Sequence, residues 1–259
     1  MTISDTIIEH KKVEILKRKR KRRIQDLEEF ELYNRSPLKI CREVSDTGPG
    51  IIAEFKRRSP SRGTINEEAN PVIVSKGYIN AGAAAVSILT DRDFFGGSFH
   101  DLESVKKENP EICLLRKDFI LDPYQVHESK AYGADIILLI AALLSPEAVR
   151  DLSFLAFSLG LQVLFEVHDR GDIDKYAEGI DLVGVNNRNL RDFTVDIRHS
   201  LELIDHLPDG VLTVSESGIK GKEEIDVLFN RGFKFFLIGE TFMKESDPGE
   251  ACKLFIQSI

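Results

Sequence analysis

Charged side chains stand where a buried strand is expected in the stretch IIAEFK, residues 51–56. Successive side chains of a strand point to opposite faces, so Ile52, Glu54 and Lys56 share one face and the apolar residues between them share the other. Burying an unpaired charge is costly. Glu54 and Lys56 therefore form either a structural salt bridge or part of a functional site, and this stretch alone does not decide between the two.

Further polar and ionisable residues stand at or just after the ends of later apolar runs. These residues are Lys117, Glu166, Asn186, Arg188, Glu216 and Ser217. Ammonium and carboxylate groups can donate and accept protons in catalysis, and guanidinium groups bind anions. Lys117 and Glu166 could instead be an ion pair that only stabilises the fold. Their meaning depends on whether the fold brings the ends of these runs together.

The runs themselves predict the fold. They cover residues 51–56, 83–89, 112–119, 134–140, 161–167, 181–187, 211–217 and 233–239. Several intervening segments open with Asn-Pro, Asp-Pro or Ser-Pro and close on Gly, which is how helices begin and end. Repeated strand–helix–Gly–strand units imply parallel strands, and eight of them predict a closed (β/α)8 TIM barrel of the α/β class. The lack of Gly-x-Gly-x-x-Gly after the first run weakens a dinucleotide-binding sheet.

A barrel gathers the charged residues at one rim. Residues at the carboxyl ends of barrel strands face the active site, and strand alternation can point five charged side chains inward there. These five are Glu54, Lys56, Lys117, Glu166 and Glu216. SESGI after the seventh run and LIGE at the eighth occupy the usual phosphate position of such barrels. Taken singly, Ser217 could be only a helix cap, and Gly218 and Gly239 only turn glycines.

Composition narrows the class of protein. The 259 residues carry a formal charge of −8, which argues against a general nucleic-acid binder. Cys41, Cys113 and Cys252 form neither a paired framework nor a metal spacing, and Cys113 fits a core position. The start MTISDTIIEHKK lacks the apolar segment of a signal peptide, and the run at 136–144 is too short to span a bilayer. We expect a cytoplasmic protein without a metal, with His168 as a rim histidine.

The segment before the first run is basic. Nine Lys or Arg lie between Lys11 and Arg23. Apolar residues near helical spacing could pack one side of this segment against the barrel; they are Val13, Leu16, Ile24, Leu27 and Phe30. The basic residues form either a solvated face or an anionic-surface helix, and the acidic balance of the whole chain favours the solvated face.

Seven motifs together resemble one enzyme family, indole-3-glycerol phosphate synthase, a barrel of tryptophan biosynthesis. They are IIAEFKRRSPSRG, VSILTDRDFFGGSFHDL, LLRKDFILDPYQ, LFEVH, GVNNRNL, SESGI and LIGETFM. The resemblance runs in order over about residues 45–259, and an N-terminal helical extension is also a family feature. Two departures are the absence of Trp and the acidic Glu240 beside the expected phosphate, where only backbone N–H donors would serve.

The resemblance implies a lyase that needs no cofactor. It would close the indole ring of 1-(2-carboxyphenylamino)-1-deoxyribulose 5-phosphate with loss of carbon dioxide and water. By match to the family, Lys117 is the acid that protonates the ketose carbonyl, and either Glu166 or Lys56 serves the dehydration step. Glu54 and Glu216 would hold these lysines and the ribulose hydroxyls. The expected catalytic residues are Lys117, Glu166, Lys56, Glu54, Asn186 and Glu216.

Binding roles follow the same match. The expected substrate-binding residues are Arg188, Ser59, Phe95, Leu115, Phe119, Leu138 and Leu190, with Phe94 beside them. The apolar members would enclose the anthranilate ring or would be barrel core, and for Leu138 the two alternatives are balanced. The expected phosphate-binding residues are Ser217, Gly218, Gly239 and Glu240. The polar segment 56–68 should be mobile without ligand and close over the substrate.

Two rival functions remain at this level. Phosphoribosylanthranilate isomerase is another phosphate-binding barrel, but it relies on a Cys base where this chain has Lys56. A non-catalytic protein could bind nucleic acid through the basic segment, with a steep salt dependence. We expect one domain over 1–259, with an extension at 1–48 and a barrel at 49–259. Its partner would be a phosphorylated small molecule, without nucleic acid or membrane, and the protein would be a monomer or weak oligomer.

Overall fold

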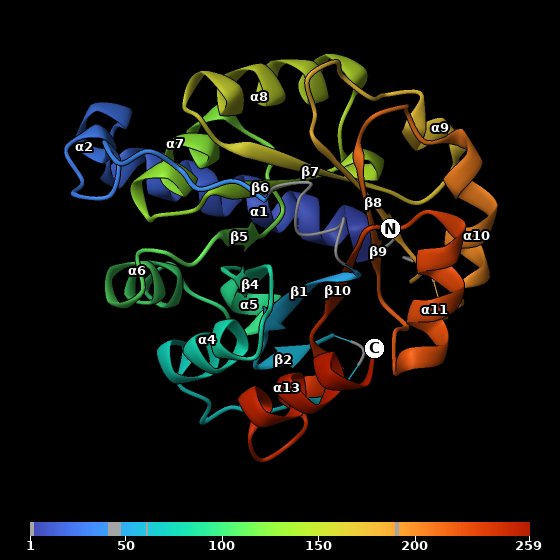
Figure 1. Cartoon of the computed structure of the whole chain (residues 1–259). Helices are drawn as coiled ribbons and strands as arrows, with labels where there is room; N and C mark the ends of the chain where they lie inside the picture. The colour runs from blue at the N-terminus through green and yellow to red at the C-terminus, as the bar shows by residue number, and fades with distance from the viewer. Residues whose placement is uncertain (1–2, 41–47, 61, 190–191) are drawn as a thin grey trace.

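The computed structural model describes residues 3–40, 48–60, 62–189 and 192–259. Eight parallel strands close into a barrel in the order β1-β10-β9-β8-β7-β6-β5-β4, with helices around it (Figure 1). The strands are β1 (Gly50–Phe55), β4 (Ala85–Leu89), β5 (Leu114–Lys117), β6 (Ile136–Ile140), β7 (Gln162–Val167), β8 (Leu182–Asn186), β9 (Leu212–Glu216) and β10 (Phe235–Ile238). The (β/α)8 barrel predicted from the eight runs is confirmed.

Twelve helices are assigned within the described ranges. They are α1 (Ile3–Lys21), α2 (Ile24–Glu28), α4 (Pro71–Asn80), α5 (Arg92–Phe95), α6 (Phe99–Glu108), α7 (Pro123–Ala131), α8 (Pro146–Ser158), α9 (Arg170–Ile173), α10 (Arg198–Leu203), α11 (Lys222–Arg231), α12 (Glu240–Met243) and α13 (Pro248–Ser258). Short 3-10 turns, η1 (Ala141–Leu143) and η2 (Ile204–His206), follow β6 and α10. A small hairpin, β2 (Arg58–Ser59) with β3 (Gly63–Thr64), follows β1.

Helix starts follow the Xaa-Pro signals in the sequence. Asn70, Asp122, Ser145 and Asp247 each cap a helix whose first residue is Pro, and each side chain accepts a hydrogen bond from a backbone N–H of the first turn. Such caps satisfy donors that have no partner inside the helix. These local signals fix where the crossover helices α4, α7 and α8 and the C-terminal helix α13 begin.

Strand alternation divides the core into two layers. Ile51, Ala53 and Phe55 of β1 pack outward against the helices, whereas Ile52 joins the apolar interior of the barrel. The same alternation turns Glu54, two residues further along β1, into the barrel at its carboxyl end. The predicted assignment of side chains to the two faces of this strand is therefore confirmed.

The barrel closes where the first strand meets the last. β1 pairs with β10 in parallel, with Gly50 opposite Phe235 and Ala53 opposite Ile238. An added Cβ at Gly50 would lie 2.5 Å from the ring of Phe235, so the close approach requires glycine there. We refer to the β1–β10 pairing as the seam.

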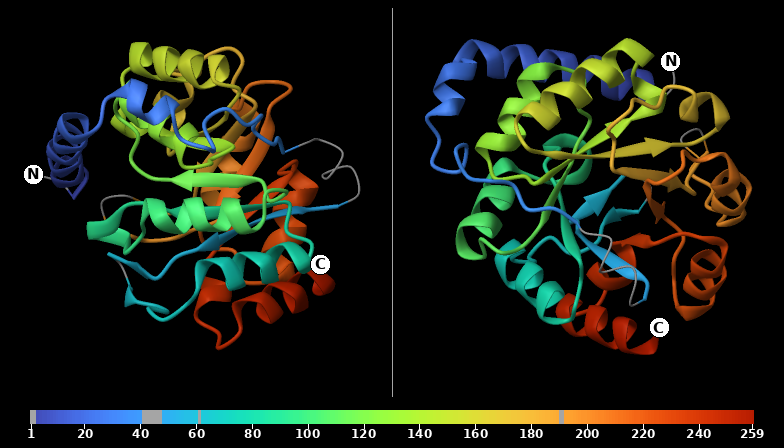
Figure 2. Two further views of the ribbon diagram at one scale, coloured as in Figure 1. Left: turned by 90° about the vertical axis from the view of Figure 1, so that its left-hand side faces the viewer. Right: turned by 45° about the horizontal axis from the view of Figure 1, so that its top comes forward.

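The N-terminal extension contacts both ends of the barrel. Figure 2 shows α1 outside the ring of helices, at the end toward which the strands point. At the opposite end, the backbone N–H of Leu38 donates to Asp135, 2.7 Å away, and that of Ile40 donates to Gln162, 2.8 Å away. Asp135 precedes β6 and Gln162 begins β7. The extension therefore packs against the barrel at both of its ends and is part of the same folded unit.

The predicted packing side is right for Leu27 of α2, which is buried against α7 with Ile24 and Phe30 packed beside it, and wrong for α1. Val13 and Leu16 are 51% and 55% exposed, whereas Ile7, Lys11 and Ile15 are buried. The four-residue spacing of the buried residues defines one face of the helix. A lysine stands in the middle of that face because it has acidic partners on the barrel. None of the helices in the described ranges is long and apolar enough to cross a membrane.

Candidate active site

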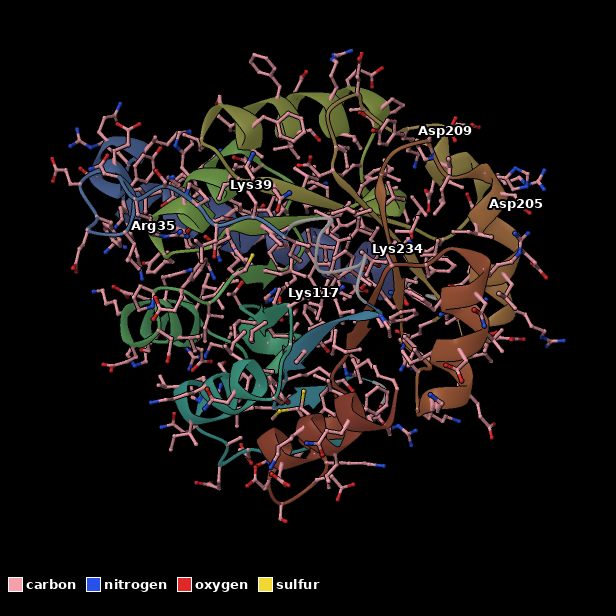
Figure 3. The ribbon with its side chains drawn as sticks, viewed as in Figure 1. Arg35, Lys39, Lys117, Asp205, Asp209 and Lys234 are labelled. Carbon is pink, nitrogen blue, oxygen red and sulfur yellow. The ribbon has the colours of Figure 1, made fainter. Side chains whose placement is uncertain are left out.

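A cavity of about 700 Å³ lies at the carboxyl ends of the strands. Lys117, at the end of β5, lies near the centre of the ring of strands (Figure 3). The cavity brings together most of the residues singled out from the sequence, which come from all eight barrel strands or their following loops. Those that line it are Glu54, Lys56, Ser59, Phe95, Lys117, Phe119, Leu138, Glu166, Asn186, Arg188, Glu216, Ser217, Gly218, Gly239 and Glu240.

Lys117 is held between two carboxylates. Its ammonium group donates to Oε2 of Glu166 at 3.1 Å and, in a short contact, to Oε2 of Glu216. The amide of Asn186 donates to the other oxygen of Glu166 at 3.1 Å. The other oxygen of Glu216 is buried and has no hydrogen-bond partner among the described residues. The site thus contains a charged donor, a fully engaged carboxylate and one buried acceptor that is available to a ligand.

Two glycines, one on β8 and one just after β10, make room for two of the carboxylates. A Cβ at Gly184 of β8 would lie 2.4 Å from the free oxygen of Glu216. A Cβ at Gly239 would lie 2.7 Å from Oε1 of Glu54. Glu54 accepts a hydrogen bond from Lys56, whose Nζ is 2.6 Å away. A side chain at either glycine position would therefore displace the neighbouring carboxylate.

Electrostatics set the protonation states of the cluster. Burial raises the pKa of Glu216 to about 7, and Glu166 adds to the effect, against the attraction of Lys117. Burial alone would raise the pKa of Glu166, but Lys117, His168 and Asn186 lower it below its ordinary value. Burial would lower the pKa of Lys117, yet Glu216, Glu166 and Glu54 raise it well above its ordinary value. At neutral pH, Lys117 is a cation and Glu166 an anion, while Glu216 is present in both its protonated and its ionised form.

The turn after β9 has a strained backbone. Ser217 has φ of 68°, a left-handed conformation that favours glycine, and Gly218 follows with φ of 82°. The side chain of Asn187 donates to the carbonyl of Ser217 at 3.1 Å and so holds the turn. Lys220 and Lys244 also line the cavity. Sequence reasoning missed these two cations, which stand beyond the SESGI and LIGE motifs.

The aromatic side of the cavity differs in part from expectation. The rings of Phe95 and Phe119 lie 6.0 Å apart and both line the cavity, as does Leu138. Leu115 lies deeper, fully buried in the barrel interior, because it precedes Lys117 by two residues on the same inward face. Phe94 packs its ring against His10 at 5.5 Å instead of lining the cavity. Leu190 lies outside the described residues.

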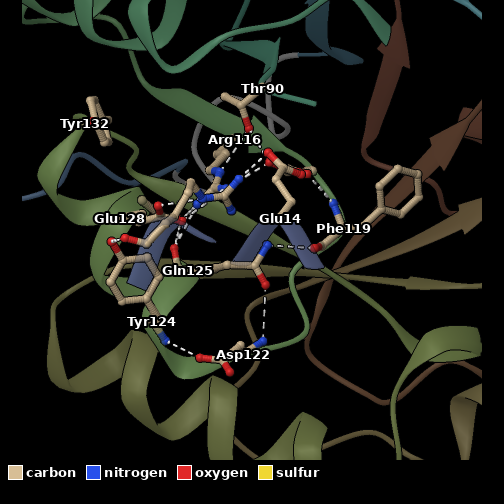
Figure 4. Close-up of polar contacts among 12 residues, drawn as sticks. Glu14, Thr90, Arg116, Phe119, Asp122, Tyr124, Gln125, Glu128 and Tyr132 are labelled. Atoms are coloured by element: carbon tan, nitrogen blue, oxygen red, sulfur yellow. Dashed lines mark hydrogen bonds and ion pairs between the residues drawn. The ribbon is translucent and has the colours of Figure 1, made fainter. Parts of the chain in front are cut away.

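A buried ion network ties α1 to this site, and the sequence did not predict it. Lys11, with no exposed surface, lies 2.6 Å from Asp91 and 3.0 Å from Asp118, two residues that line the cavity. Arg116 donates to Asp118 at 2.8 Å and to Thr90 at 3.0 Å (Figure 4). Adjacent residues of β5 thus face opposite ways, Lys117 into the cavity and Arg116 toward the helices.

Comparison with known proteins settles the family. The family model described as indole-3-glycerol phosphate synthase matches residues 4–255. The chain belongs to the indole-3-glycerol phosphate synthase family. An indole-3-glycerol phosphate synthase from Bacteroides thetaiotaomicron is 42% identical over 257 residues, covering 99% of this chain and 98% of that protein. One from Chlorobium limicola is 42% identical over 247 residues, covering 93% and 94%.

The barrel of this indole-3-glycerol phosphate synthase family member is also similar to solved structures of other enzymes. The 3-hexulose-6-phosphate synthase from Salmonella typhimurium superposes with a TM-score of 0.65 at 13% identity, covering 81% of this chain and 97% of that one. Tryptophan synthase subunit alpha from Legionella pneumophila gives 0.58 at 12% identity, covering 83% and 92%. At this level of identity the likeness is one of fold alone.

Proposed function

We propose that the protein converts 1-(2-carboxyphenylamino)-1-deoxyribulose 5-phosphate into indole-3-glycerol phosphate, as a carboxy-lyase of tryptophan biosynthesis. The observation that carries the proposal is the cationic Lys117 between Glu166 and Glu216 inside the cavity, in a chain of this family. Proton donors and acceptors supplied by the chain itself suffice for each step, so we expect catalysis without a metal or nucleotide.

Ring closure uses Lys117 as the proton donor. The aromatic carbon that bears the carboxylate attacks the ketose carbonyl carbon, and the carbonyl oxygen takes the proton. Its raised pKa keeps Lys117 protonated at neutral pH. The alkoxide that forms is a stronger base than an amine, so the transfer is favourable in the transition state, where general acids act. Carbon dioxide then leaves, and the electron pair of the broken bond restores the aromatic ring.

Dehydration requires one proton to leave carbon and another to reach the departing hydroxyl. Glu166 is the better placed of the two candidates for the base, because it is ionised and contacts Lys117, whereas Lys56 is engaged by Glu54. Lys117 can receive the proton that Glu166 collects. The free oxygen of Glu216 suits a ribulose hydroxyl, which would satisfy a buried acceptor.

The reaction takes up protons overall. Two protons go to oxygen, one at the carbonyl and one at the leaving hydroxyl, and one proton comes from carbon. The substrate carboxylate departs as neutral carbon dioxide, so each turnover consumes one proton from solution. A site that works repeatedly must therefore have a route for that proton.

The remaining lining residues suit substrate binding. The phosphate is placed at Ser217, Gly218 and Gly239, where backbone N–H groups can donate and Lys220 and Lys244 add positive charge. Glu240 contributes its backbone, and its side chain pairs with Arg62 at 3.1 Å. Phe95, Phe119 and Leu138 would hold the anthranilate ring, while Asn186 and Arg188 face its carboxylate and Ser59 the polar rim.

The test is direct turnover of the substrate. Purified protein mixed with the carboxyphenylamino ribulose phosphate should develop indole absorbance, and Lys117→Met, of similar volume, should abolish it. Folding of the variant is checked by circular dichroism. Absence of product with the folded wild-type protein would refute the function.

We also propose that the chain works as one barrel domain with its extension, as a monomer or weak oligomer in the cytoplasm, without nucleic acid or membrane. The acidic balance of the chain supports this, and so does the use of Lys11 and Arg18 in ion pairs with the barrel. Light scattering across a range of concentrations tests the oligomeric state.

A further inference from the structure

His168 lies behind the active-site carboxylate Glu166. It follows β7, two residues beyond Glu166 and therefore on the same side of the strand. Its Nε2 is 3.5 Å from Oε1 of Glu166, while the other oxygen of that carboxylate faces Lys117. His168 is not among the residues that line the cavity. Glu166 thus separates an imidazole on its outer side from the proposed proton donor on its inner side.

The other edge of the imidazole faces a second carboxylate. Nδ1 of His168 is 3.8 Å from Oδ2 of Asp172 on α9, and Lys175 holds Asp172 with a 3.2 Å contact. His199 of α10 binds the backbone carbonyl of His168 through a ring nitrogen. The side chain as a whole is 13% exposed, but both ring nitrogens are buried, and neither makes a hydrogen bond to a residue that the structure describes. This imidazole is thus placed between two carboxylates with both nitrogens uncommitted.

The proposed reaction requires a proton from solution in each turnover. Glu166 can return the carbon-derived proton to Lys117, which replaces one of the two protons that oxygen takes up. The second must enter from outside, and a route that reaches Glu166 from the side away from the cavity would be independent of the bound substrate. An imidazole exchanges protons with solvent near neutral pH more readily than any other side chain.

We propose that His168 is a positioning and proton-relay residue that supplies this proton to the site through Glu166. A proton from solution reaches Nδ1 when the partly exposed ring moves, and the Nε2 proton passes to Oε1 of Glu166. The carboxyl group then turns so that this proton faces Lys117 and passes to its neutral amine. No electrons are transferred, His168 is left neutral with its proton on Nδ1, and proton exchange restores the Nε2–H tautomer. A small rotation of the ring closes the 3.5 Å gap to hydrogen-bond distance. The inference rests on the proposed function.

The experiment compares three variants with the wild-type protein. His168→Asn keeps a polar group at the position of Nδ1 but lacks the ring nitrogen that faces Glu166, so it cannot relay a proton. His168→Ala leaves space for added imidazole. His206→Asn, an exposed histidine of η2, is the matched control. For each, kcat and KM are measured from pH 6 to 9, with and without imidazole, in H2O and D2O, and thermal unfolding is followed by circular dichroism.

We expect both His168 variants to lower kcat by about a hundredfold or more, within the range for general acid–base groups, while KM changes by less than about threefold. Added imidazole should restore turnover to the Ala variant, and the solvent isotope effect on kcat should rise in the Asn variant. His206→Asn should match the wild type. A normal kcat in His168→Asn, or a loss that imidazole does not relieve in a folded Ala variant, overturns the relay. Inactive wild-type protein would instead refute the proposed function.

Discussion

The ammonium nitrogen of Lys117 lies 3.1 Å from Oε2 of Glu166, which puts the proposed acid and the proposed base of the site in direct contact. A proton taken from carbon by one can therefore pass to the other without crossing water. The same contact keeps Lys117 charged between steps, since the carboxylates raise its pKa well above the ordinary value.

Lys117→Ala should remove turnover while sparing ground-state binding. The lost interaction is made mainly in the transition state, so kcat and kcat/KM should fall together by about 10²–10⁴-fold. Steady-state kinetics measure both. A folded variant that keeps more than about a tenth of kcat would have lost far less activity than the removal of a general acid causes, and would refute the assignment.

Lys56→Ala should behave differently. Lys56 lies at the end of the seam, pairs with Glu54 at 2.6 Å and lines the cavity, where its charge attracts the anionic substrate. Its loss should raise KM by about tenfold, because one charged hydrogen bond is worth about 1.5–3 kcal/mol. An unchanged KM in kinetic assays of the purified variant would exclude Lys56 from substrate binding.

Glu216→Gln should stabilise the protein relative to the wild type, and this gain in unfolding free energy should grow as the pH rises. Burial raises the pKa of Glu216 to about 7, above its unfolded value, so the native state keeps a proton that the unfolded chain has lost. Native stability therefore falls as the pH rises from the ordinary carboxyl range through 7, and Gln removes that loss. We expect a gain of about 1–3 kcal/mol at pH 8 and little at pH 4.

Urea unfolding at the two pH values measures this difference. A Gln variant that loses stability relative to wild type as the pH rises would show that the ionised carboxylate is stabilising. Turnover by the same variant should be reduced, since the free oxygen proposed for a ribulose hydroxyl becomes part of an amide.

Lys11→Met should destabilise the protein. Asp91 and Asp118 have side chains that are 1% exposed, and removing Lys11 leaves them without that counter-charge. Breaking a buried ion pair from one side costs about 3–5 kcal/mol. Lys12→Met is the control on the same helix, because Lys12 is 58% exposed and pairs only with the exposed Glu9 among the residues described here. Equal unfolding free energies for the two variants would contradict the prediction.

The segment after β1 should exchange amide hydrogens unevenly. Arg57 is anchored to Asp101 at 2.6 Å, and Arg58 donates to the carbonyls of Arg92 and Asp93. Near the tip, the backbone N–H of Arg62 donates to the carbonyl of Ser59 at a long 3.3 Å, and its side chain forms an exposed pair with Glu240. Exchange near the tip should slow when a product analogue binds, while a peptide from α8 should not change. Identical tip exchange in both states would exclude closure.

The barrel and most of the site could be predicted from local patterns. Strand period, helix caps and turn glycines are properties of short stretches, and they sufficed to place Lys117, Glu166 and Glu216 at the same rim. Leu115 was misplaced because depth within a barrel depends on where each strand ends. The end of β5 at Lys117 is set by its register with the neighbouring strands, which a single stretch of sequence does not show.

Contacts between distant segments could not be predicted. The burial of Lys11 depends on Asp91 and Asp118, about 80 to 107 residues away, and a lysine without visible partners reads as solvated. Val13 and Leu16 seemed to define a packing face because apolar residues usually do. Likewise, the proposed role of His168 depends on the distance from its ring to Glu166, which the sequence alone does not give.

The seam has a consequence for protein synthesis. Glu54 and Lys56 on β1 leave the ribosome long before Phe235–Ile238 of β10, the strand that pairs with β1 and completes the cavity wall. At about 5–20 residues per second, β1 waits about ten to forty seconds for this partner, with one edge unpaired. A nascent chain arrested before β10 should therefore be inactive, and its exposed strand edge should make it a substrate for chaperones.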